Sequence, residues 1–582
     1  LCSAPVLAEL PDGYWTVADS QPLLDATLRE ELHPDLSGLT DAESRAVDEL
    51  IAAGKIMHSL YERQLHRDAV AAKTALDALH ASGADIEATG NLLDLYYLYK
   101  GPIGTTLENQ RLPFVPATGE QAGKNVYPHA LERDAIDAWL AANPDATDEI
   151  LAVRTVVRRT TAENVTADLE RLAEHPAVDV LHPGLRQRLE GLGTFGNDFY
   201  AVPYALAYAD ELAAARQHLE AAAAHVQAEA PDFAAYLRNR GRDFLAGNYE
   251  AGDASWVSGD FAGLNIQIGS YETYNDNLRG VKAFYSASIL ARDEQKSREL
   301  EAAMAELQAI EDSLPYAVHK TVRRRIPVGV YNVIADFGQA RGANTATILP
   351  NNPDHARKYG RTILMRYNIM TNDAIFANRK LRFDAVMDAN FRDHLTKDGG
   401  FNRTLWHEVG HYLGVSKTAD GSDLDAALAD RSNLFEEMKS DLVSLYAAPR
   451  LREMGYHDDE GLRAHYADGI RRTLQSVKPR PQQAYQNMQL MQFNYYMEAG
   501  LLEASPETGL LTVDYSRYHE VVTDLLGEVL NIQYSGDYEL ADAFVKRWNY
   551  WDDALHGGLA KRINDSGSYR RTMVRYRALA GE

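Results

Sequence analysis

The stretch His407-Glu408-Val409-Gly410-His411 decides how this chain is interpreted. The residues on both sides, 402–406 and 412–414, have helical character. On a helix, residues four apart lie on one face, about 6 Å apart along the axis. The two imidazoles can therefore bind one metal ion, and Glu408 can reach a water on that ion. Two His ligands and a general base in this spacing are typical of a zinc hydrolase.

A second segment, 435–446, supplies acidic residues for the same site. Its apolar residues follow helical spacing, and Glu437 and Asp441 share one face. We expect Glu437 to be the third ligand of one Zn²⁺ per chain, with one position left open for water. Glu436 and Asp441 are expected to orient the His rings through their other nitrogens. A solvated acidic helix start would also account for these acids, but the two patterns together favour a metal site.

Composition limits the partners of the chain. The 582 residues suffice for two or more lobes, and 45% hydrophobic with 25% charged residues is ordinary for a globular protein. Acidic residues outnumber basic ones by 84 to 59, which gives a net charge of −25. Such a chain repels phosphate backbones and anionic lipid, so we expect no nucleic-acid partner. No stretch has the length of a transmembrane segment.

Cys2 is the sole cysteine, so an intrachain disulfide is excluded. Small residues follow it, as they follow the lipidated cysteine of a bacterial lipoprotein. Cys2 is therefore a candidate lipid anchor, and we expect a location in the bacterial cell envelope or periplasm. The preceding Leu1 departs from that pattern, and a cytoplasmic chain with a chance cysteine is the alternative.

The hydrophobic pattern predicts an α+β chain that is mostly α. Helical spacing covers 39–63, 71–79, most of 132–247 and the region from 404 onward, whereas 101–128 is expected to form a loop. Alternating or β-branched runs predict strands at 264–268, 328–334 and 362–367. A small β-rich body is therefore expected between 264 and 370.

At its two zinc-site segments the chain resembles the dipeptidyl peptidase III metallopeptidases, and its short His-Glu-x-x-His form resembles their bacterial branch. The likeness continues in order along the chain, from about residue 95 to residue 505. The matching segments are 123–128, 236–256, 268–276, 349–352 and 492–500.

The resemblance implies two lobes with a wide cleft, a helical zinc-binding lobe and a lobe with a small β-barrel. It also implies a monomer that binds a peptide substrate in the cleft. The expected divisions are a mainly helical part leading into the β-containing lobe (1–285), a helical-lobe segment (286–330), a return to the β-containing lobe (331–378), the catalytic lobe (379–560) and a C-terminal segment (561–582).

The resemblance also implies a set of substrate-binding residues, and here the chain departs from the family. The implied residues are Asn265, Gln267, Gly269, Tyr271, Glu272 and Asn351. Asn265 and Gln267 stand where the family has a Glu and a Tyr, and that Glu captures the free amino terminus of the peptide. Tyr485 stands where a His faces the metal, and we expect its hydroxyl to donate a hydrogen bond to the developing oxyanion.

These observations predict a zinc-dependent peptidase for short peptides with altered recognition of the N-terminal amine. One alternative is a non-catalytic, zinc-bearing peptide-binding protein, and another is an amidase acting on a non-peptide substrate. Glu408 argues against a pure binding protein, which has no use for a general base.

Overall fold

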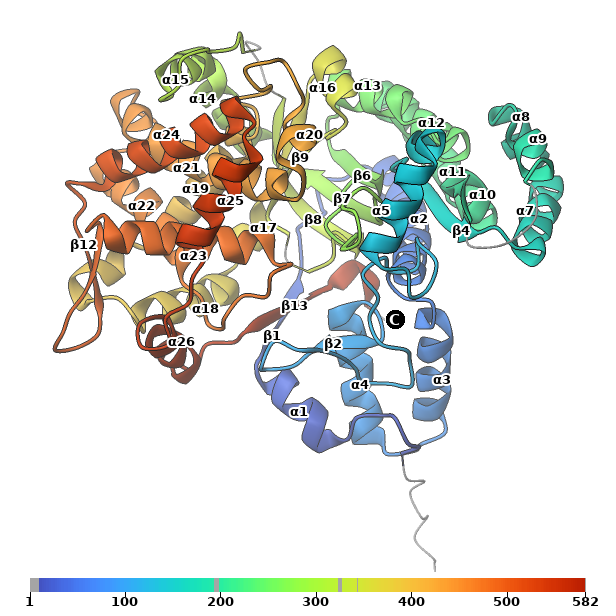
Figure 1. The fold of residues 1–582 in the computed structure, drawn as a ribbon, viewed down its shortest axis with the longest axis horizontal. Coiled ribbons are helices and arrows are strands. Elements are labelled where there is room, and N and C mark those ends of the chain that lie inside the picture. The colour runs from blue at the N-terminus through green and yellow to red at the C-terminus, as the bar shows by residue number, and fades with distance from the viewer. Residues whose placement is uncertain (1–9, 193–197, 323–326, 343, 581–582) are drawn as a thin grey trace, which may run out of the picture.

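A computed structural model describes residues 10–192, 198–322, 327–342 and 344–580 (Figure 1). The chain is mostly helical with an α+β arrangement, as the sequence pattern predicts. Cys2 lies outside the described residues. Within these residues, every helix is too short or too polar to cross a membrane.

The N-terminal half is built mainly from helices that flank a central sheet. The longest, α2 (Asp41–Leu65), begins after Thr40, whose hydroxyl accepts the Glu43 backbone N–H at 3.1 Å. The other helices of this half are α1 Val17–Asp25, α3 Ala69–Ala81, α4 Ile86–Tyr99, α5 Arg133–Ala142, α6 Thr147–Ile150, α7 Ala162–Glu174, α8 Pro176–Leu181, α9 Leu185–Glu190, α10 Tyr204–Ala207, α11 Ala209–Val226, α12 Pro231–Ala246 and α13 Glu250–Ser258.

The central sheet has five described strands in the order β6-β7-β8-β10-β9. Their bounds are β6 Leu264–Ser270, β7 Tyr285–Arg292, β8 Val328–Gly338, β9 Ala346–Leu349 and β10 Thr362–Arg366. Neighbouring strands are antiparallel except β8 and β10, which are parallel. Smaller described pairs are β1 Thr27–Leu32 with β13 Arg571–Tyr576, β2 Ile103–Thr105 with β3 Arg111–Pro113, β4 Thr155–Arg159 with β5 Phe199–Pro203, and β11 Leu502–Ala504 with β12 Leu511–Val513.

The expected small β-barrel is not found in the described part of the chain, because the edge strands β6 and β9 do not pair with each other. Tyr236 of α12 donates a hydrogen bond to the Ile266 carbonyl of β6 at 2.8 Å, so a helix side chain satisfies part of that strand. The sheet is nevertheless curled. Thr347 of β9 reaches Gln267 of β6 at 3.2 Å, across the width of the sheet.

The helices of the C-terminal half lie on the other side of the sheet, except α16 (Pro353–Tyr359), which packs beside α13 (Figure 1). The helices of this half are α14 Glu294–Ala303, α15 Leu307–Ser313, α16 Pro353–Tyr359, α17 Tyr367–Met370, α18 Asp373–Asp384, α19 Lys397–Gly410, α20 Leu424–Leu428, α21 Ser432–Glu453, α22 Asp459–Thr473, α23 Ala484–Glu498, α24 Tyr518–Ser535, α25 Tyr538–Trp548 and α26 His556–Asp565.

Two large apolar cores hold these parts together. One joins the N-terminal helices to β6, β7 and part of β8, and the other is formed mainly by the C-terminal helices with the ends of β8, β9 and β10. The central sheet contributes to both cores. Strand β13 returns from the C-terminal helices and pairs in parallel with β1, so residues 571–576 lie beside residues 27–32 (Figure 1).

Candidate metal centre

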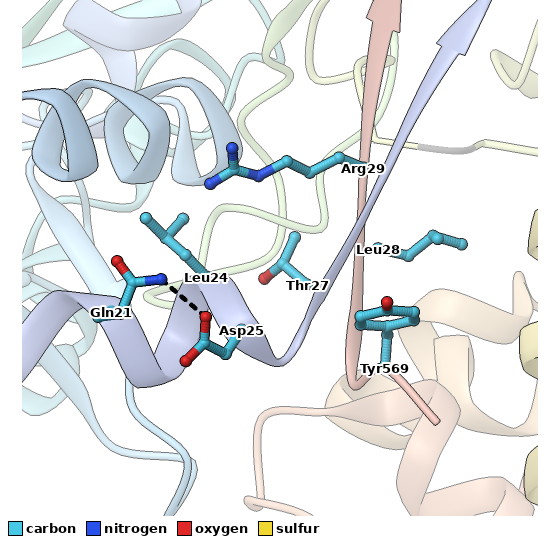
Figure 2. A pocket seen from close by; sticks show the side chains of 7 residues that line it. All are labelled: Gln21, Leu24, Asp25, Thr27, Leu28, Arg29 and Tyr569. Carbon is cyan, nitrogen blue, oxygen red and sulfur yellow. Dashed lines mark hydrogen bonds between the residues drawn. The ribbon is translucent and has the colours of Figure 1, made fainter. Parts of the chain in front are cut away.

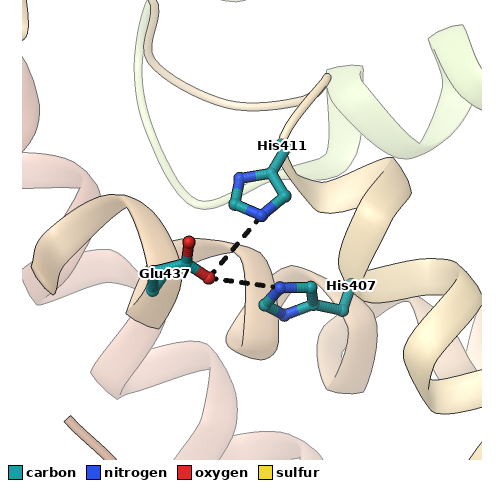
Figure 3. A group of neighbouring side chains, drawn as sticks. All are labelled: His407, His411 and Glu437. Carbon is teal, nitrogen blue, oxygen red and sulfur yellow. Dashed lines mark ion pairs between the residues drawn. The ribbon is translucent and has the colours of Figure 1, made fainter. Parts of the chain in front are cut away.

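Helices α19 and α21 bring His407, His411 and Glu437 together, and the three side chains point toward one another (Figure 3). Glu437 Oε2 lies 3.3 Å from His407 Nε2 and 3.6 Å from His411 Nε2. One ligand atom from each residue lies within 4.8 Å of the others. The i, i+4 spacing of the histidines and the packing of the second helix thus produce a three-ligand set.

The outer nitrogen of each imidazole has its own partner. His407 Nδ1 lies 2.6 Å from Asp441 Oδ1, and His411 Nδ1 lies 2.9 Å from both Glu436 Oε1 and Ser440 Oγ. A carboxylate at Nδ1 favours the tautomer that carries its proton there and leaves the Nε2 lone pair free. Both lone pairs then face Glu437, which is the arrangement that a metal requires.

The Glu437 carboxylate supplies the test of whether a cation fits. Its Oε1 accepts a hydrogen bond from the Tyr485 hydroxyl at 2.7 Å, whereas the buried Oε2 has no described partner other than the two imidazole nitrogens at 3.3 and 3.6 Å. Leaving a buried carboxylate oxygen unsatisfied is costly. Two imidazoles and a carboxylate with one position open are the donors of a catalytic zinc site, so the residues fit Zn²⁺.

Electrostatics hold the ligand set in a defined charge state in the absence of metal. Burial lowers the pKa of His407, but the carboxylates of Asp441 and Glu437 outweigh it and raise that pKa to about 9. Burial acts in the opposite sense on Asp441, yet Arg472, His407 and Arg403 hold its pKa well below the usual range. Arg403 Nη1 is 2.7 Å from Asp441, so an arginine fixes the group that orients His407.

Lys439 closes the end of the helix that carries both histidines. Its ammonium is buried and donates to the carbonyls of Gly410 at 2.7 Å and Leu413 at 2.9 Å. It also lies 2.9 Å from Glu436 Oε1, the carboxylate beside His411. A cation at a helix C-terminus satisfies orphan carbonyls and opposes the negative end of the helix dipole.

Glu408 lies on the same helix and is buried, and no described protein group hydrogen-bonds its carboxylate. The segment 272–274 approaches this site from the sheet. Burial, together with the charges of Glu437 and Glu408, raises the pKa of Glu272 to about 7. The Tyr274 ring meets the Tyr485 ring edge-on, with centroids 6.5 Å apart. Tyr274 belongs to the matching segment 268–276, but its place beside Tyr485 depends on the packing of two segments that are far apart in the sequence.

The substrate-binding residues expected on β6 are buried and already have partners. Asn265 accepts a hydrogen bond from Trp256 Nε1 at 2.8 Å and donates one to the Tyr331 hydroxyl at 2.9 Å. Gln267 accepts one from Arg366 Nη2 at 3.1 Å. Their contact with a substrate remains a prediction.

The other expected substrate residues lie close together at the end of β6. Asn351 Nδ2 donates to the Tyr271 carbonyl at 2.8 Å and lies 3.5 Å from Glu272 Oε2. Gly269 has a φ of 138°, and a β-carbon there would lie 2.7 Å from the Tyr249 ring. The structure therefore brings Tyr271, Glu272 and Asn351 into one cluster, and the backbone conformation of Gly269, near the end of β6, requires glycine.

A surface hollow lies away from the metal centre, beside α1 and β1 (Figure 2). Its volume is about 470 Å³, and it is lined by Gln21, Leu24, Asp25, Thr27, Leu28, Arg29 and Tyr569. Gln21 and Asp25 are hydrogen-bonded to each other at 2.7 Å. The hollow contains no metal-ligating group of residues.

Comparison with known proteins identifies the fold. No known protein-family profile matches the chain. Nudix hydrolase 3 of Arabidopsis thaliana is 24% identical over 554 residues, a match that covers 89% of this chain and 68% of the plant protein. The structure of DPP III from Caldithrix abyssi has a TM-score of 0.79 at 23% identity and covers 96% of this chain and 99% of that one.

A second solved structure agrees with the first. Dipeptidyl-peptidase III from Corallococcus sp. strain EGB has a TM-score of 0.81 at 24% identity, over 97% of this chain and 98% of that one. The chain thus has the dipeptidyl peptidase III fold over nearly its whole length, which confirms the resemblance at the level of the fold.

Proposed function

We propose that this protein is a zinc-dependent peptidase that hydrolyses peptide bonds of short peptides. The observation that carries the proposal is the buried Glu437 Oε2, which faces two imidazole nitrogens and has no other described partner. The buried carboxylate of Glu408 on the same helix supports catalysis rather than zinc storage. The fold shared with two dipeptidyl peptidase III structures supports a peptide substrate.

The residues around the site divide the work of amide hydrolysis. Zn²⁺ bound by His407, His411 and Glu437 would polarise the scissile carbonyl and lower the pKa of a water. Glu408 takes a proton from the attacking water and passes it to the leaving amine. Burial and the neighbouring Glu437 keep the pKa of Tyr485 well above its usual value, so its hydroxyl stays protonated. That hydroxyl donates to Glu437 Oε1 in this structure and would turn from this acceptor to the developing oxyanion.

We further propose that recognition of the peptide amino terminus differs from strict release of dipeptides. Amides at Asn265 and Gln267 cannot form the ion pair that a carboxylate makes with an ammonium group. Both amides are also engaged within the protein. A free amino terminus should therefore contribute little to affinity, and blocked peptides should be accepted.

Cleavage of a mixed peptide library tests these proposals. Half the peptides carry a blocked amino terminus, products are identified by mass spectrometry, and Glu408→Ala is the control. Glu408-dependent cleavage of blocked peptides supports both proposals. Dipeptides released only from free amino termini would retain the peptidase but refute altered amine recognition. Zinc binding without Glu408-dependent cleavage would refute the peptidase and favour a binding protein or an amidase.

The location and assembly of the protein are separate proposals. We propose a cell-envelope location carried by a lipid on Cys2, and fractionation of cells expressing the chain with Cys2 or Cys2→Ser tests it. We expect a monomer, for which light scattering would give the mass of one chain. We also expect no nucleic-acid partner.

A further inference from the structure

The turn between β2 and β3 presents an asparagine, Asn109, to the C-terminal half of the chain. Asn109 has a φ of 64°, in the left-handed region that asparagine adopts more readily than most residues. Two backbone hydrogen bonds close the turn: Thr106 N–H donates to the Gln110 carbonyl at 2.9 Å, and Asn109 N–H donates to the Thr106 carbonyl at 3.1 Å. The turn therefore holds the Asn109 side chain in a defined direction.

That side chain is bound to the loop 478–483, which precedes α23. Asn109 Nδ2 donates to the Lys478 carbonyl at 3.3 Å and to Gln483 Oε1 at 3.0 Å. Arg480 Nη1 donates to the backbone carbonyl and to Oδ1 of Asn109, each at 2.9 Å. Both polar atoms of the Asn109 amide thus contact this loop, so a residue of the N-terminal half fixes a segment of the C-terminal half.

The same loop is folded against the start of the helix that carries Tyr485. Gln483 Oε1 also accepts the backbone N–H of Arg480 at 2.7 Å. Asn487 Nδ2 donates to the carbonyls of Arg480 and Gln483 at 2.8 and 2.9 Å. Gln483 is the N-cap residue of α23 but makes no side-chain hydrogen bond to the helix. The first turn of α23, which contains Tyr485, therefore depends on the loop for its position.

Tyr485 extends from this first turn to the metal centre. Its hydroxyl donates to Glu437 Oε1 at 2.7 Å, and its ring meets the Tyr274 ring edge-on. The hydroxyl has a single proton, so it can stabilise an oxyanion only if a small rotation brings that proton from Glu437 to the reacting oxygen. A misplacement of about 1 Å can reduce catalysis by about 10²-fold. The position of the first turn of α23 therefore matters for this step.

We propose that Asn109 is a positioning residue that holds Tyr485 in place beside the metal centre. The inference rests on the proposed function and adds to it a residue that touches neither the metal ligands nor the reacting atoms. Asn109 acts through the loop 478–483, whereas the zinc ligands belong to α19 and α21, which pack directly against each other. Loss of the Asn109 amide should therefore impair turnover and leave the zinc site intact.

Asn109→Gly tests the proposal, because glycine adopts a φ of 64° without strain and the substitution removes only the side chain. We expect kcat to fall about tenfold on a peptide that the parent protein cleaves, with unchanged zinc content. The same substitution in the Tyr485→Phe protein should change kcat by less than about twofold, because no hydroxyl remains to be misplaced. Gln110→Ala is the matched control, since it shortens an exposed amide side chain of the same turn and should leave kcat unchanged.

A measurement without turnover separates this proposal from the peptidase itself. 3-Fluorotyrosine introduced at position 485 of the zinc-loaded protein reports the surroundings of that ring by fluorine NMR. The resonance should shift or broaden in Asn109→Gly and stay unchanged in Gln110→Ala. If Asn109→Gly does not fold, Gln483→Leu removes the acceptor of the same hydrogen bond and should produce the same changes in kcat and in the resonance.

The positioning role is overturned if Asn109→Gly keeps the kcat of the parent protein or leaves the fluorine resonance unchanged. It is also overturned if Asn109→Gly lowers kcat equally with and without the Tyr485 hydroxyl, which is the result that a general structural role predicts. A parent protein that cleaves no peptide refutes the proposed peptidase, and the fluorine resonance then decides alone whether Asn109 positions Tyr485.

Discussion

Gly410 lies so close to α21 that a β-carbon on it would be 2.6 Å from the carbonyl oxygen of Ser440 and 2.8 Å from its Cα. Backbone atoms cannot yield as a flexible side chain can, so any larger residue separates α19 from α21. This contact lies between His407 and His411 on one helix and beside Glu437 on the other. The absence of a side chain at position 410 therefore sets the distance between the ligands.

Gly410→Ala should cause loss of zinc. An alanine ordinarily stabilises a helix by about 1 kcal/mol relative to glycine, but here it must displace a backbone and move Glu437 away from the imidazoles. Zinc content by mass spectrometry and thermal unfolding check this expectation. Gly558→Ala in α26 is the control, because nothing lies within 4 Å of its added β-carbon. A Gly410→Ala protein with full zinc content would contradict the argument.

Substitutions of Glu408 and Glu437 should separate the loss of catalysis from the loss of metal binding. Glu408→Gln should keep zinc and reduce kcat by about 10² to 10⁴, the usual contribution of a general base. Glu437→Gln removes a charged ligand and should lose zinc at micromolar chelator concentrations. Measurements of zinc content and kcat on both variants distinguish a general base from a metal ligand. Equal loss of zinc in the two variants would show that Glu408 is part of the coordination instead.

Zinc affinity should depend on pH through His407. In the metal-free protein its pKa is raised to about 9, so its proton stabilises the folded state fully below pH 6.5, and this contribution is lost as pH rises through 9. Zinc must displace that proton, and its affinity should rise about tenfold per pH unit up to pH 9. Competition with a chelator between pH 6 and 9.5 measures the slope.

Asp441→Asn removes the largest cause that raises the pKa of His407, so the break in this profile should move to lower pH. Affinity above the break should fall by about 10 to 100-fold, because the ring loses its orienting partner. Asp468→Asn is the control, since Asp468 pairs with Arg403 at 2.9 Å without touching His407. Superimposable profiles for Asp441→Asn and the parent would contradict this role.

The grouping of His407, His411 and Glu437 could be predicted from the sequence because helix periodicity alone places His407 above His411. Glu436, Glu437 and Asp441 are likewise found by local spacing once a second helix is assumed. The roles of Lys439, Arg403 and Gly410 depend on how two helices pack, and a buried lysine cannot be distinguished from a solvated one in a charged segment.

The strands, too, divide into those that the local sequence pattern predicts and those that it does not. Alternating apolar residues correctly predict β6, β8 and β10. Strand β7 was missed although Tyr285-Ser286-Ala287-Ser288-Ile289 alternates apolar and polar residues and the strand pairs with β6 on one side and β8 on the other. The predicted loop 101–128 contains β2 and β3, which form a hairpin too short to show periodicity. The expectation of a barrel came only from the family resemblance. Whether the two edge strands of a sheet pair and close it depends on tertiary contacts, which the local sequence pattern does not show.

Tyr485→Phe should reduce kcat by about 10 to 10³ with little effect on zinc content. The hydroxyl donates to Glu437 Oε1 at 2.7 Å, and its single proton would turn from that acceptor to the charge that develops beside the metal. Steady-state kinetics on a peptide cleaved by the parent protein provides the test. Tyr495→Phe, on the same helix α23 with its hydroxyl 3.2 Å from Glu528, is the matched control. Full activity of Tyr485→Phe would exclude the hydroxyl from catalysis.

Lys439→Met should both destabilise the protein and weaken zinc binding. Methionine preserves much of the buried volume but leaves the carbonyls of Gly410 and Leu413 and the Glu436 carboxylate without their donor. Breaking a buried charge pair costs about 3 kcal/mol. Because Glu436 also contacts His411, the stability difference between zinc-loaded and zinc-free protein should shrink as well. Thermal unfolding with and without zinc measures both effects.

Lys73→Met is the control, since Lys73 pairs with Asp77 on the surface of α3 and should change stability by less than about 0.5 kcal/mol. A loss of stability that leaves the zinc-dependent difference intact would confine Lys439 to capping the helix.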